Sequence, residues 1–280
     1  MWKQPWSSFR WVVIVGGLLA QPLRITTGVL GKDPRFHLQG RTPAQLDSLR
    51  RAAQQGETSA CLALVEHYQL VELQPDSAQK YLKIAAQKGA PEAQYLLGLT
   101  YLRGVEGPKR PAEGRRLLEA AAAQNYLLAL KVLYEVLEPP DSLSPLYVAV
   151  LPPDAKAAFR YAQRAAELGD PQAMTTLGRY YASGKGGTPR NDSLAQFWLE
   201  KAAQTGYIPA QLLLAEWSLQ RWHNPAKALF WAHEVLRNPR STPEALAQAR
   251  VAAYYAEYLP QWLHLWYKLL FLPAEFSALP

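Results

Sequence analysis

The sequence predicts an all-α fold, a right-handed α-solenoid of about six antiparallel helix pairs. From residue 40 onwards the chain is rich in Ala, Leu, Gln, Glu, Lys and Arg and poor in Val and Ile, a composition that favours helices over strands. A pair of small residues followed by a turn residue also recurs along the chain. Its spacing is the scale of helix-pair repeats, which stack into solenoids.

The recurring unit is two alanines, two further residues and then a residue suited to a turn. The turn residues are Gly56, Gly89, Asn125, Gly169 and Gly206, at steps of 33, 36, 44 and 37 residues. An alanine follows each of them by four positions, at Ala60, Ala93, Ala129, Ala173 and Ala210. Glycine provides the left-handed backbone that ends a helix, and small side chains let two helices approach closely. Each unit is therefore expected to form one helix pair.

Two of the units share a longer motif. Residues 93–125 contain Leu97-Gly98, Tyr101 and Gly104, and residues 173–206 contain Leu177-Gly178, Tyr181, Gly184, Ala195 and Trp198. This pattern resembles the Sel-one-like repeat (SLR) family, a branch of the tetratricopeptide-like (TPR-like) α-solenoids, over roughly residues 42–238. Other units depart from it: Tyr134 and Ala215 stand where the family has glycine. The resemblance implies a non-enzymatic scaffold that binds protein or peptide partners.

The first thirty residues have the charge order of an export signal. Lys3 and Arg10 precede an apolar run from Trp11 to Ala20, which Gln21 and Pro22 interrupt. The run is too short for a straight membrane-spanning helix and fits a signal peptide or N-terminal membrane anchor, residues 1–30. We therefore expect a cell-envelope protein, periplasmic or anchored in the inner membrane if the source is bacterial. The alternative is a cytoplasmic adaptor with these residues folded into the domain.

Two segments depart from the repeat. Residues 139–153 form an insertion with paired prolines at both ends, which we interpret as a surface loop or a docking element. Residues 242–280 are expected to form aromatic capping helices on the pair at 209–237. The stripe expected to face that pair is Tyr255, Tyr258, Trp262, Leu265, Trp266 and Leu269. Leu263 and Tyr267 lie on another side, and we predict that they mediate self-association or partner docking.

Several functional classes lack support in the sequence. The net charge of +7 is scattered, with no run of more than two basic residues, which disfavours nucleic-acid binding. Neither the single cysteine nor the five histidines show metal-ligand spacing, and the glycine-rich residues 183–192 lack the order of a phosphate loop. We therefore expect no enzyme activity, no catalytic residues, no cofactor and no metal.

The partner is expected to bind along the first helices of the repeats. Alignment with the tetratricopeptide pattern puts a set of differing side chains on their inner face: Tyr95, Leu99, Lys131, Glu135, Thr175, Arg179, Leu212 and Glu216. Helical repeats that read RNA need polar side chains at one constant offset in each repeat. At the offset of Tyr95 the repeats have Leu62, Tyr95, Lys131, Thr175 and Leu212, in which no such code is visible, so the set favours a protein or peptide partner over nucleic acid. A solenoid with a small-molecule or glycan site remains a further alternative.

Overall fold

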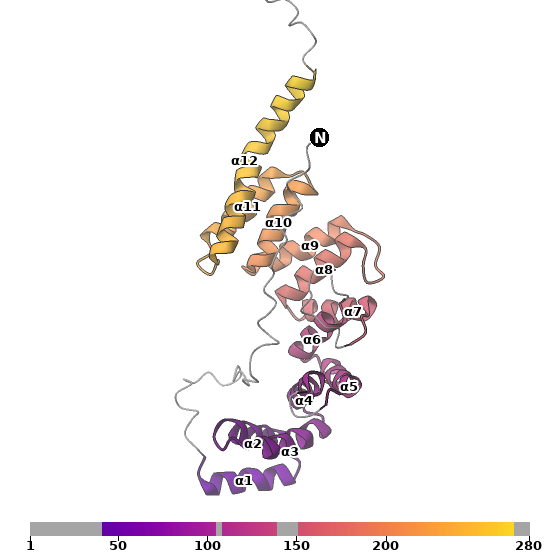
Figure 1. Cartoon of the computed structure of the whole chain (residues 1–280), viewed down its shortest axis with the longest axis vertical. Coiled ribbons are helices and arrows are strands. Elements are labelled where there is room, and N and C mark those ends of the chain that lie inside the picture. Colours follow the sequence, from indigo (N-terminus) through magenta and orange to yellow (C-terminus); the bar gives the residue numbers. More distant parts are fainter. Residues whose placement is uncertain (1–40, 105–107, 139–150, 272–280) are drawn as a thin grey trace, which may run out of the picture. The chain divides into compact units, whose positions relative to one another are not determined.

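The computed structural model describes residues 41–104, 108–138 and 151–271, with side chains as far as residue 258. These residues contain twelve helices and no strand, which confirms the all-α prediction (Figure 1). The helices are α1 (Pro43–Gln54), α2 (Thr58–Leu70), α3 (Pro75–Gln87), α4 (Pro91–Arg103), α5 (Pro111–Ala123), α6 (Leu127–Leu137), α7 (Ala155–Glu167), α8 (Pro171–Ser183), α9 (Asp192–Gln204), α10 (Ile208–Gln220), α11 (Pro225–Arg237) and α12 (Pro243–Phe271).

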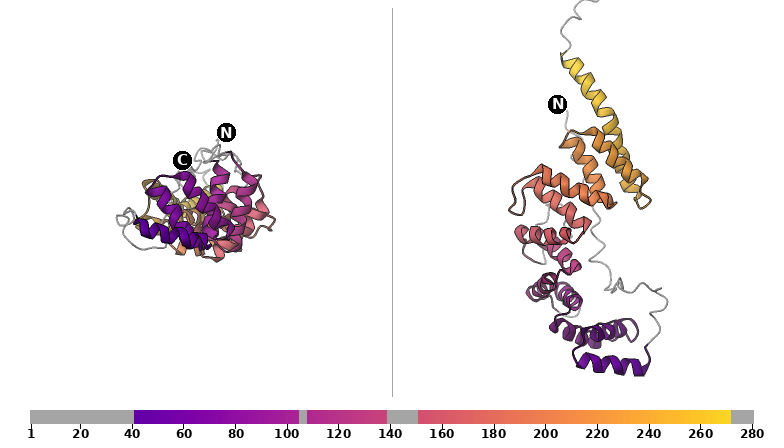
Figure 2. Two further views of the ribbon diagram at one scale, coloured as in Figure 1. Left: turned by 90° about the horizontal axis from the view of Figure 1, so that it is seen from below. Right: turned by 180° about the vertical axis from the view of Figure 1, so that it is seen from behind.

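The chain divides into two compact units, with the boundary inside α3 between Tyr81 and Leu82. Within the second unit, helices that follow one another in sequence pack together as pairs: α4 with α5, α6 with α7, α8 with α9, and α10 with α11 (Figure 2). We call α4, α6, α8 and α10 the A helices, because each contains the repeat alanine near its start. Their partners α5, α7, α9 and α11 are the B helices. This pairing is the solenoid arrangement expected from the repeat.

All five predicted turn residues adopt the left-handed backbone. Their φ angles lie between 59° at Asn125 and 92° at Gly169. At Gly169 the amides of Gly169 and Asp170 donate to the backbone carbonyls of Ala166 and Ala165, 3.0 Å away in both cases. The turn thus satisfies carbonyls that the end of the helix leaves without partners. The next A helix can then start within three residues.

Glycine inside an A helix marks a close helix–helix contact. A Cβ atom built on Gly178 of α8 would lie 2.6 Å from Cγ of Leu199 on α9, and one on Gly98 of α4 would lie 2.9 Å from Cγ of Leu118 on α5. Real Cβ atoms do not come that near to another carbon, so only glycine allows these two helix pairs to pack at this distance. The predicted role of the small residues is confirmed at both positions.

Helix α12 runs beside α11, also contacts α10, and extends past the end of α11 (Figure 2). It packs through small residues, with Ala245, Ala249 and Ala256 buried. The prediction that Tyr255 and Tyr258 face the α10–α11 pair is wrong, because both side chains are exposed. The alanine face allows the closer approach and turns the tyrosines outward. The side chains of Leu263 and Tyr267 lie outside the described residues.

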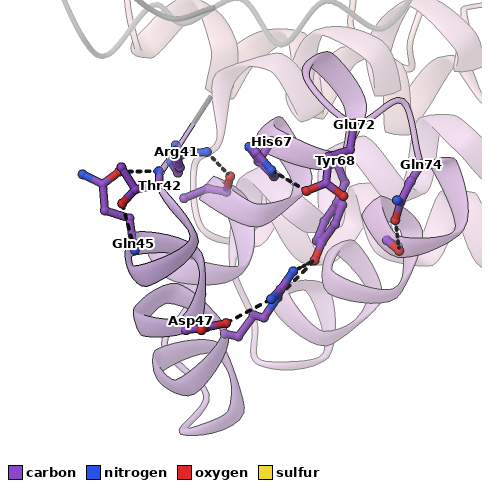
Figure 3. A network of polar contacts seen from close by, with 11 residues as sticks. Arg41, Thr42, Gln45, Asp47, His67, Tyr68, Glu72 and Gln74 are labelled. Atoms are coloured by element: carbon purple, nitrogen blue, oxygen red, sulfur yellow. Dashed lines mark hydrogen bonds and ion pairs between the residues drawn. The ribbon is translucent and has the colours of Figure 1, made fainter. Parts of the chain in front are cut away.

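The described part of the first unit contains α1, α2 and the start of α3, joined by polar contacts (Figure 3). Arg41 donates to the Ala63 carbonyl at 2.7 Å and to the Glu66 carboxylate at 3.2 Å. From α1, Arg50 donates twice to the Tyr68 hydroxyl on α2, at 3.0 and 3.2 Å. These bonds attach the first helix and the residue before it to α2.

Two predicted segments fall largely outside the described residues. These are the N-terminal residues 1–30 and most of the insertion, residues 139–150. Where the description resumes, Leu151 is buried and the Asp154 amide donates to the Leu137 carbonyl at 2.9 Å. Among the helices that the structure describes, none has the length and apolar character needed to cross a bilayer.

Candidate functional site

The candidate site is a row of side chains along the A helices, which we call the A-helix face. Positions three, four and seven residues apart lie on one side of a helix, so each A helix contributes one stripe. The face comprises Tyr95, Leu99 and Arg103 of α4; Lys131 and Glu135 of α6 and Glu138 directly after it; Gln172, Thr175 and Arg179 of α8; and Leu212, Glu216 and Gln220 of α10. All eight predicted groove residues belong to this row.

At α4 the face is aromatic and closely packed. Tyr95 is only 8% exposed, and its ring lies 5.5 Å from the ring of Tyr126, which precedes α6. Burial raises the pKa of Tyr126 to about 12, with smaller contributions from Glu92 and Tyr95. Leu99 is also buried. These side chains support the next repeat, and their role in binding stays a prediction.

Between α6 and α8 the face is a polar network centred on Asp170, the residue before α8. Asp170 is 6% exposed and accepts from the Lys131 ammonium at 2.9 Å, from the Tyr134 hydroxyl at 3.4 Å and from the Ala173 amide at 2.8 Å. One carboxylate therefore caps α8 and ties it to α6. Beside it, Gln172 donates to Glu135 at 2.7 Å.

Burial sets the acidity of this region. It raises the pKa of Glu135 above the usual value for glutamate, although Lys131 and the hydrogen bond from Gln172 oppose the shift. It also raises the pKa of Tyr207, the residue before α10, and Asp170 and Glu135 add to that effect. Side chains from three successive repeats thus meet at one place. The groups there are hydrogen-bonding partners held in fixed positions.

Between α8 and α10 the face opens to solvent. Arg179 is exposed, whereas Thr175 is half-buried and donates to the Pro171 carbonyl of its own helix at 2.8 Å. Burial raises the pKa of Glu216, and Gln220 and Arg179 counteract part of the shift. Leu212, by contrast, belongs to an apolar cluster with Val235 of α11 and with Ala245 and Ala249 of α12. Of the two predicted residues on α10, only Glu216 therefore remains partly accessible.

Comparison with known proteins accounts for this repeating geometry. The sequence profile of the Sel1 repeat matches residues 65–89, 91–126, 149–170 and 171–207. This chain carries Sel1 repeats. The two best-formed units of the sequence, 93–125 and 173–206, lie inside the second and fourth matches, which confirms the resemblance. The helix pairs continue on both sides of the matched segments.

Several known proteins are similar to this chain in fold or in sequence. A crystal structure of a Sel1 repeat protein from Oxalobacter formigenes has a TM-score of 0.54 with this chain at 23% identity, covering 78% of this chain and 69% of that one, which shows a shared fold. In sequence, the chain is 30% identical to chitin synthase regulatory factor 3 of Schizosaccharomyces pombe over 58% of its own length and 18% of that protein. It is 31% identical to an uncharacterized protein of Neisseria meningitidis serogroup B over 61% of its length and 40% of that protein. The chain therefore spans less than half the length of these two relatives.

The sequence reasoning missed one position that links successive A helices. It is the residue directly after the turn residues Asn125, Gly169 and Gly206, which places Tyr126, Asp170 and Tyr207 at the start of α6, α8 and α10. Tyr126 contacts Tyr95 of the preceding A helix, and Asp170 contacts Lys131 and Tyr134 of the preceding A helix. Its constant offset from the turn residue is the signal that could have identified it.

The chemistry of the A-helix face suits the binding of another polypeptide. Within the described part of the chain, no group of three His, Cys, Asp or Glu side chains is placed to hold a metal ion. Burial raises the pKa of the Cys61 thiol, which lowers the fraction of reactive thiolate at neutral pH. The A-helix face instead offers aromatic rings, carboxylates, an amide and cations in fixed order. Such a surface can recognise the side chains of another polypeptide.

The raised pKa of Glu135 predicts a pH-dependent stability. The folded chain keeps this proton to a higher pH than the unfolded chain does, so the favourable contribution is complete below the unfolded pKa and is lost as pH rises through the folded pKa. Glu135→Gln is neutral at every pH. We therefore expect the stability difference between variant and wild type to move in favour of the variant between pH 4 and pH 7, as measured by urea unfolding.

The control for this prediction is Glu167→Gln. Glu167 is exposed and, like Glu135, accepts a hydrogen bond from a glutamine side chain, here Gln163 at 3.1 Å. Because the side chain is exposed, its replacement is expected to change stability little across the same pH range. A Glu135→Gln difference that stays constant with pH would show that burial does not disfavour the ionised carboxylate.

Proposed function

We propose that this chain is a non-enzymatic scaffold that holds an extended segment of a partner protein along its A-helix face. The observation that carries the proposal is the variety of that face. The face changes from one helix pair to the next: buried tyrosine packing at α4 gives way to a charged network at α6 and α8, and then to an accessible arginine beside a glutamate at α8 and α10. A surface whose chemistry changes from repeat to repeat suits a polypeptide, whose side chains also change along its length.

Two further facts support this function. Sel1 repeats are commonly found in protein-interaction scaffolds, and two yeast relatives are named as regulators of chitin synthase. The matched part is about a fifth of each regulator. A protein that regulates an enzyme through repeats acts by contacting a partner. We propose the same general mode of action, binding to a partner protein, for the present chain. The proposal does not include chitin synthase as the partner.

We also propose that residues 1–30 direct the chain to the cell envelope, as a signal peptide or as a membrane anchor. Support comes from the order of Lys3, Arg10 and the apolar run Trp11–Ala20. Residues 1–40 fused to a reporter that is active only outside the cytoplasm should give an active reporter. An inactive reporter, with the fusion protein present in the cytoplasm, would favour the cytoplasmic alternative.

Leu263 and Tyr267 remain our proposed site of self-association or partner docking. The exposed Tyr254, Tyr255 and Tyr258 on the preceding turns of α12 support this, since clustered apolar side chains in water often mark an interface. Replacing both Leu263 and Tyr267 by serine should reduce the mass measured by light scattering and leave the melting temperature unchanged. A lowered melting temperature would instead identify both as buried core residues.

The test of the scaffold function is peptide selection followed by blocking of the face. Random peptides displayed on phage are selected on the purified chain, and the affinities of the enriched peptides are measured by fluorescence anisotropy. Thr175→Arg places a large charged side chain in the middle of the A-helix face. Because the Thr175 hydroxyl bonds, within the described residues, only to the Pro171 carbonyl of its own helix, the change should leave the repeats packed. We expect affinity to fall at least tenfold.

The matched control is Thr205→Arg. Thr205 lies in the turn after α9, and its hydroxyl likewise bonds to its own helix, to the Ala202 carbonyl at 2.7 Å. This variant should bind the selected peptides as wild type does. Selection that enriches no peptide, or equal loss of affinity in both variants, would refute binding along the A-helix face.

A further inference from the structure

A cavity of about 190 Å³ lies at the end of α8, between α8 and α10. Its walls come from the last turn of α8, from Lys185 in the following loop, from Trp217 and Arg221 at the end of α10, and from Glu138 after α6. Pockets for drug-sized ligands occupy about 300–1,000 Å³. This one is smaller and fits a single side chain. It also adjoins the A-helix face, because Arg179 and Glu138 belong to both.

The cavity wall carries more positive than negative charge. Arg179, Lys185 and Arg221 line it, against the single carboxylate of Glu138. Two further carboxylates lie nearby: Asp192 binds Arg221 and Arg190, and Glu216 interacts with Arg179. Burial raises the pKa of Glu216, and Arg179 counteracts part of that shift. Arg179 is exposed and, unlike Lys185 and Arg221, belongs to the A-helix face.

Arg221 is held in place before any ligand arrives. Its Nε donates to Asp192 at 2.9 Å, a terminal nitrogen donates to the same carboxylate oxygen at 2.6 Å, and that nitrogen also donates to the Ala182 carbonyl. Its guanidinium lies over the Trp217 ring, 5.4 Å from the centroid, and Trp217 in turn packs edge-on against Trp222 at 6.0 Å. The guanidinium of Arg221 and the indole of Trp217 thus form a pre-organised wall beside the exposed Arg179.

We propose that this cavity receives an aspartate or glutamate side chain of the bound partner, with Arg179 as the residue that selects it. The proposal rests on the scaffold function above and specifies one side chain of the partner segment. Charge complementarity carries it: the guanidinium of Arg179 can donate two parallel hydrogen bonds to a carboxylate. The aliphatic part of the incoming side chain would lie against Trp217.

The test is a comparison of peptide selections on wild type and on Arg179→Glu. Arg179 is exposed, so the charge reversal should leave the fold intact, which circular dichroism checks. Peptides selected on wild type should share an acidic residue at one aligned position. Peptides selected on Arg179→Glu should carry lysine or arginine there instead. Arg160→Glu, the same change at an exposed residue of α7 outside the cavity, should retain the acidic preference.

A second measurement separates a direct contact between Arg179 and the peptide carboxylate from a general attraction between opposite charges. In an enriched peptide the acidic residue is replaced by its amide, Asp→Asn or Glu→Gln, and anisotropy gives the affinity. We expect a loss of at least tenfold with wild type and less than threefold with Arg179→Ala, because the carboxylate has then already lost its partner. All peptides are amidated at the carboxyl terminus, so that only side-chain carboxylates are tested.

The outcomes separate this inference from the scaffold function. Peptides that bind the A-helix face, are blocked by Thr175→Arg and show no acidic preference would overturn the inference and leave the scaffold function standing. Binding that requires a free terminal carboxylate would also overturn it, since the cavity would then receive a chain end. If no peptide is enriched, both proposals fail.

Discussion

Replacing Gly178 by valine is expected to lower the free energy of unfolding by about 3 kcal/mol. The Cβ of any larger residue at this position would lie 2.6 Å from Cγ and 2.9 Å from Cδ2 of Leu199, and 3.2 Å from the Ala195 carbonyl oxygen. Leu199 is completely buried and has no free space to move into. The helices α8 and α9 must therefore separate, which breaks the packing of one repeat. Urea unfolding of the variant measures the loss.

A second substitution tests this cause. Leu199→Ala alone should cost about 2–5 kcal/mol, because it leaves a cavity. In that background, however, Gly178→Val should add less than about 1 kcal/mol, since the valine occupies the space that the leucine leaves. Gly169→Ala is the control: its φ of 92° makes it strained, but nothing lies within 4 Å of the added carbon. Its cost of about 1–2 kcal/mol should not respond to Leu199→Ala. Equal costs of Gly178→Val in both backgrounds would contradict the close contact.

Asp170→Ala is expected to destabilise the chain by about 3 kcal/mol, again measured by urea unfolding. The change removes the cap on the Ala173 amide and leaves the Lys131 ammonium and the buried Tyr134 hydroxyl without this acceptor. Asp170→Asn can still accept hydrogen bonds and should cost less. Lys131→Met in the Asp170→Ala background should restore part of the stability, because it removes the unpaired charge.

Asp154→Ala separates the capping role from the network. Asp154 caps α7 by accepting from the Ala157 amide at 3.0 Å, in the same way that Asp170 caps α8. In the part of the chain that the structure describes, its side chain makes no hydrogen bond or ion pair with another helix. Its loss should cost about 1 kcal/mol. If the two alanine variants lose equal stability, the bonds from α6 to Asp170 contribute nothing.

The repeat could be predicted from sequence because its signals are local. A left-handed turn favours glycine or asparagine, and a close helix contact needs a small residue. The roles of Gly169 in a turn and of Gly178 in a helix contact can therefore be predicted from the residue type and its place in the repeat. The predicted row of face residues follows from aligning the repeats with the tetratricopeptide pattern. These features depend on the backbone, which is the same in every repeat.

The structure differs from the prediction where side chains pack between repeats, because the local sequence pattern does not show which residues pack together. Leu212 has the register of a groove residue, yet it is buried because α12 packs there. Tyr255 and Tyr258 have the register of a packing stripe, yet alanines form the contact and the tyrosines are exposed. Asp170 looks like an ordinary helix cap in sequence. Its link to Lys131 joins residues 39 positions apart and is visible only in the fold.

The cavity at the end of α8 could not be predicted from the sequence for the same reason. Arg221 and Asp192 are 29 residues apart, and neither belongs to the Sel1 motif. Nothing in the spacing of Arg179 and Trp217 indicates that both line one hollow. The sequence placed Arg179 on the A-helix face. Its neighbours in the cavity, from which we inferred an acidic ligand, are visible only in the structure.

The central claim is that a partner segment lies along the A-helix face, and photo-crosslinking tests it most directly. Selected peptides carrying a photoreactive amino acid at each position in turn are irradiated with the full chain, and mass spectrometry locates the crosslinks. We predict crosslinks on exposed or half-buried face residues such as Lys131, Thr175, Arg179 and Glu216, moving from α6 to α10 as the label moves along the peptide. Crosslinks confined to the B helices α5, α7 and α9 would contradict the claim.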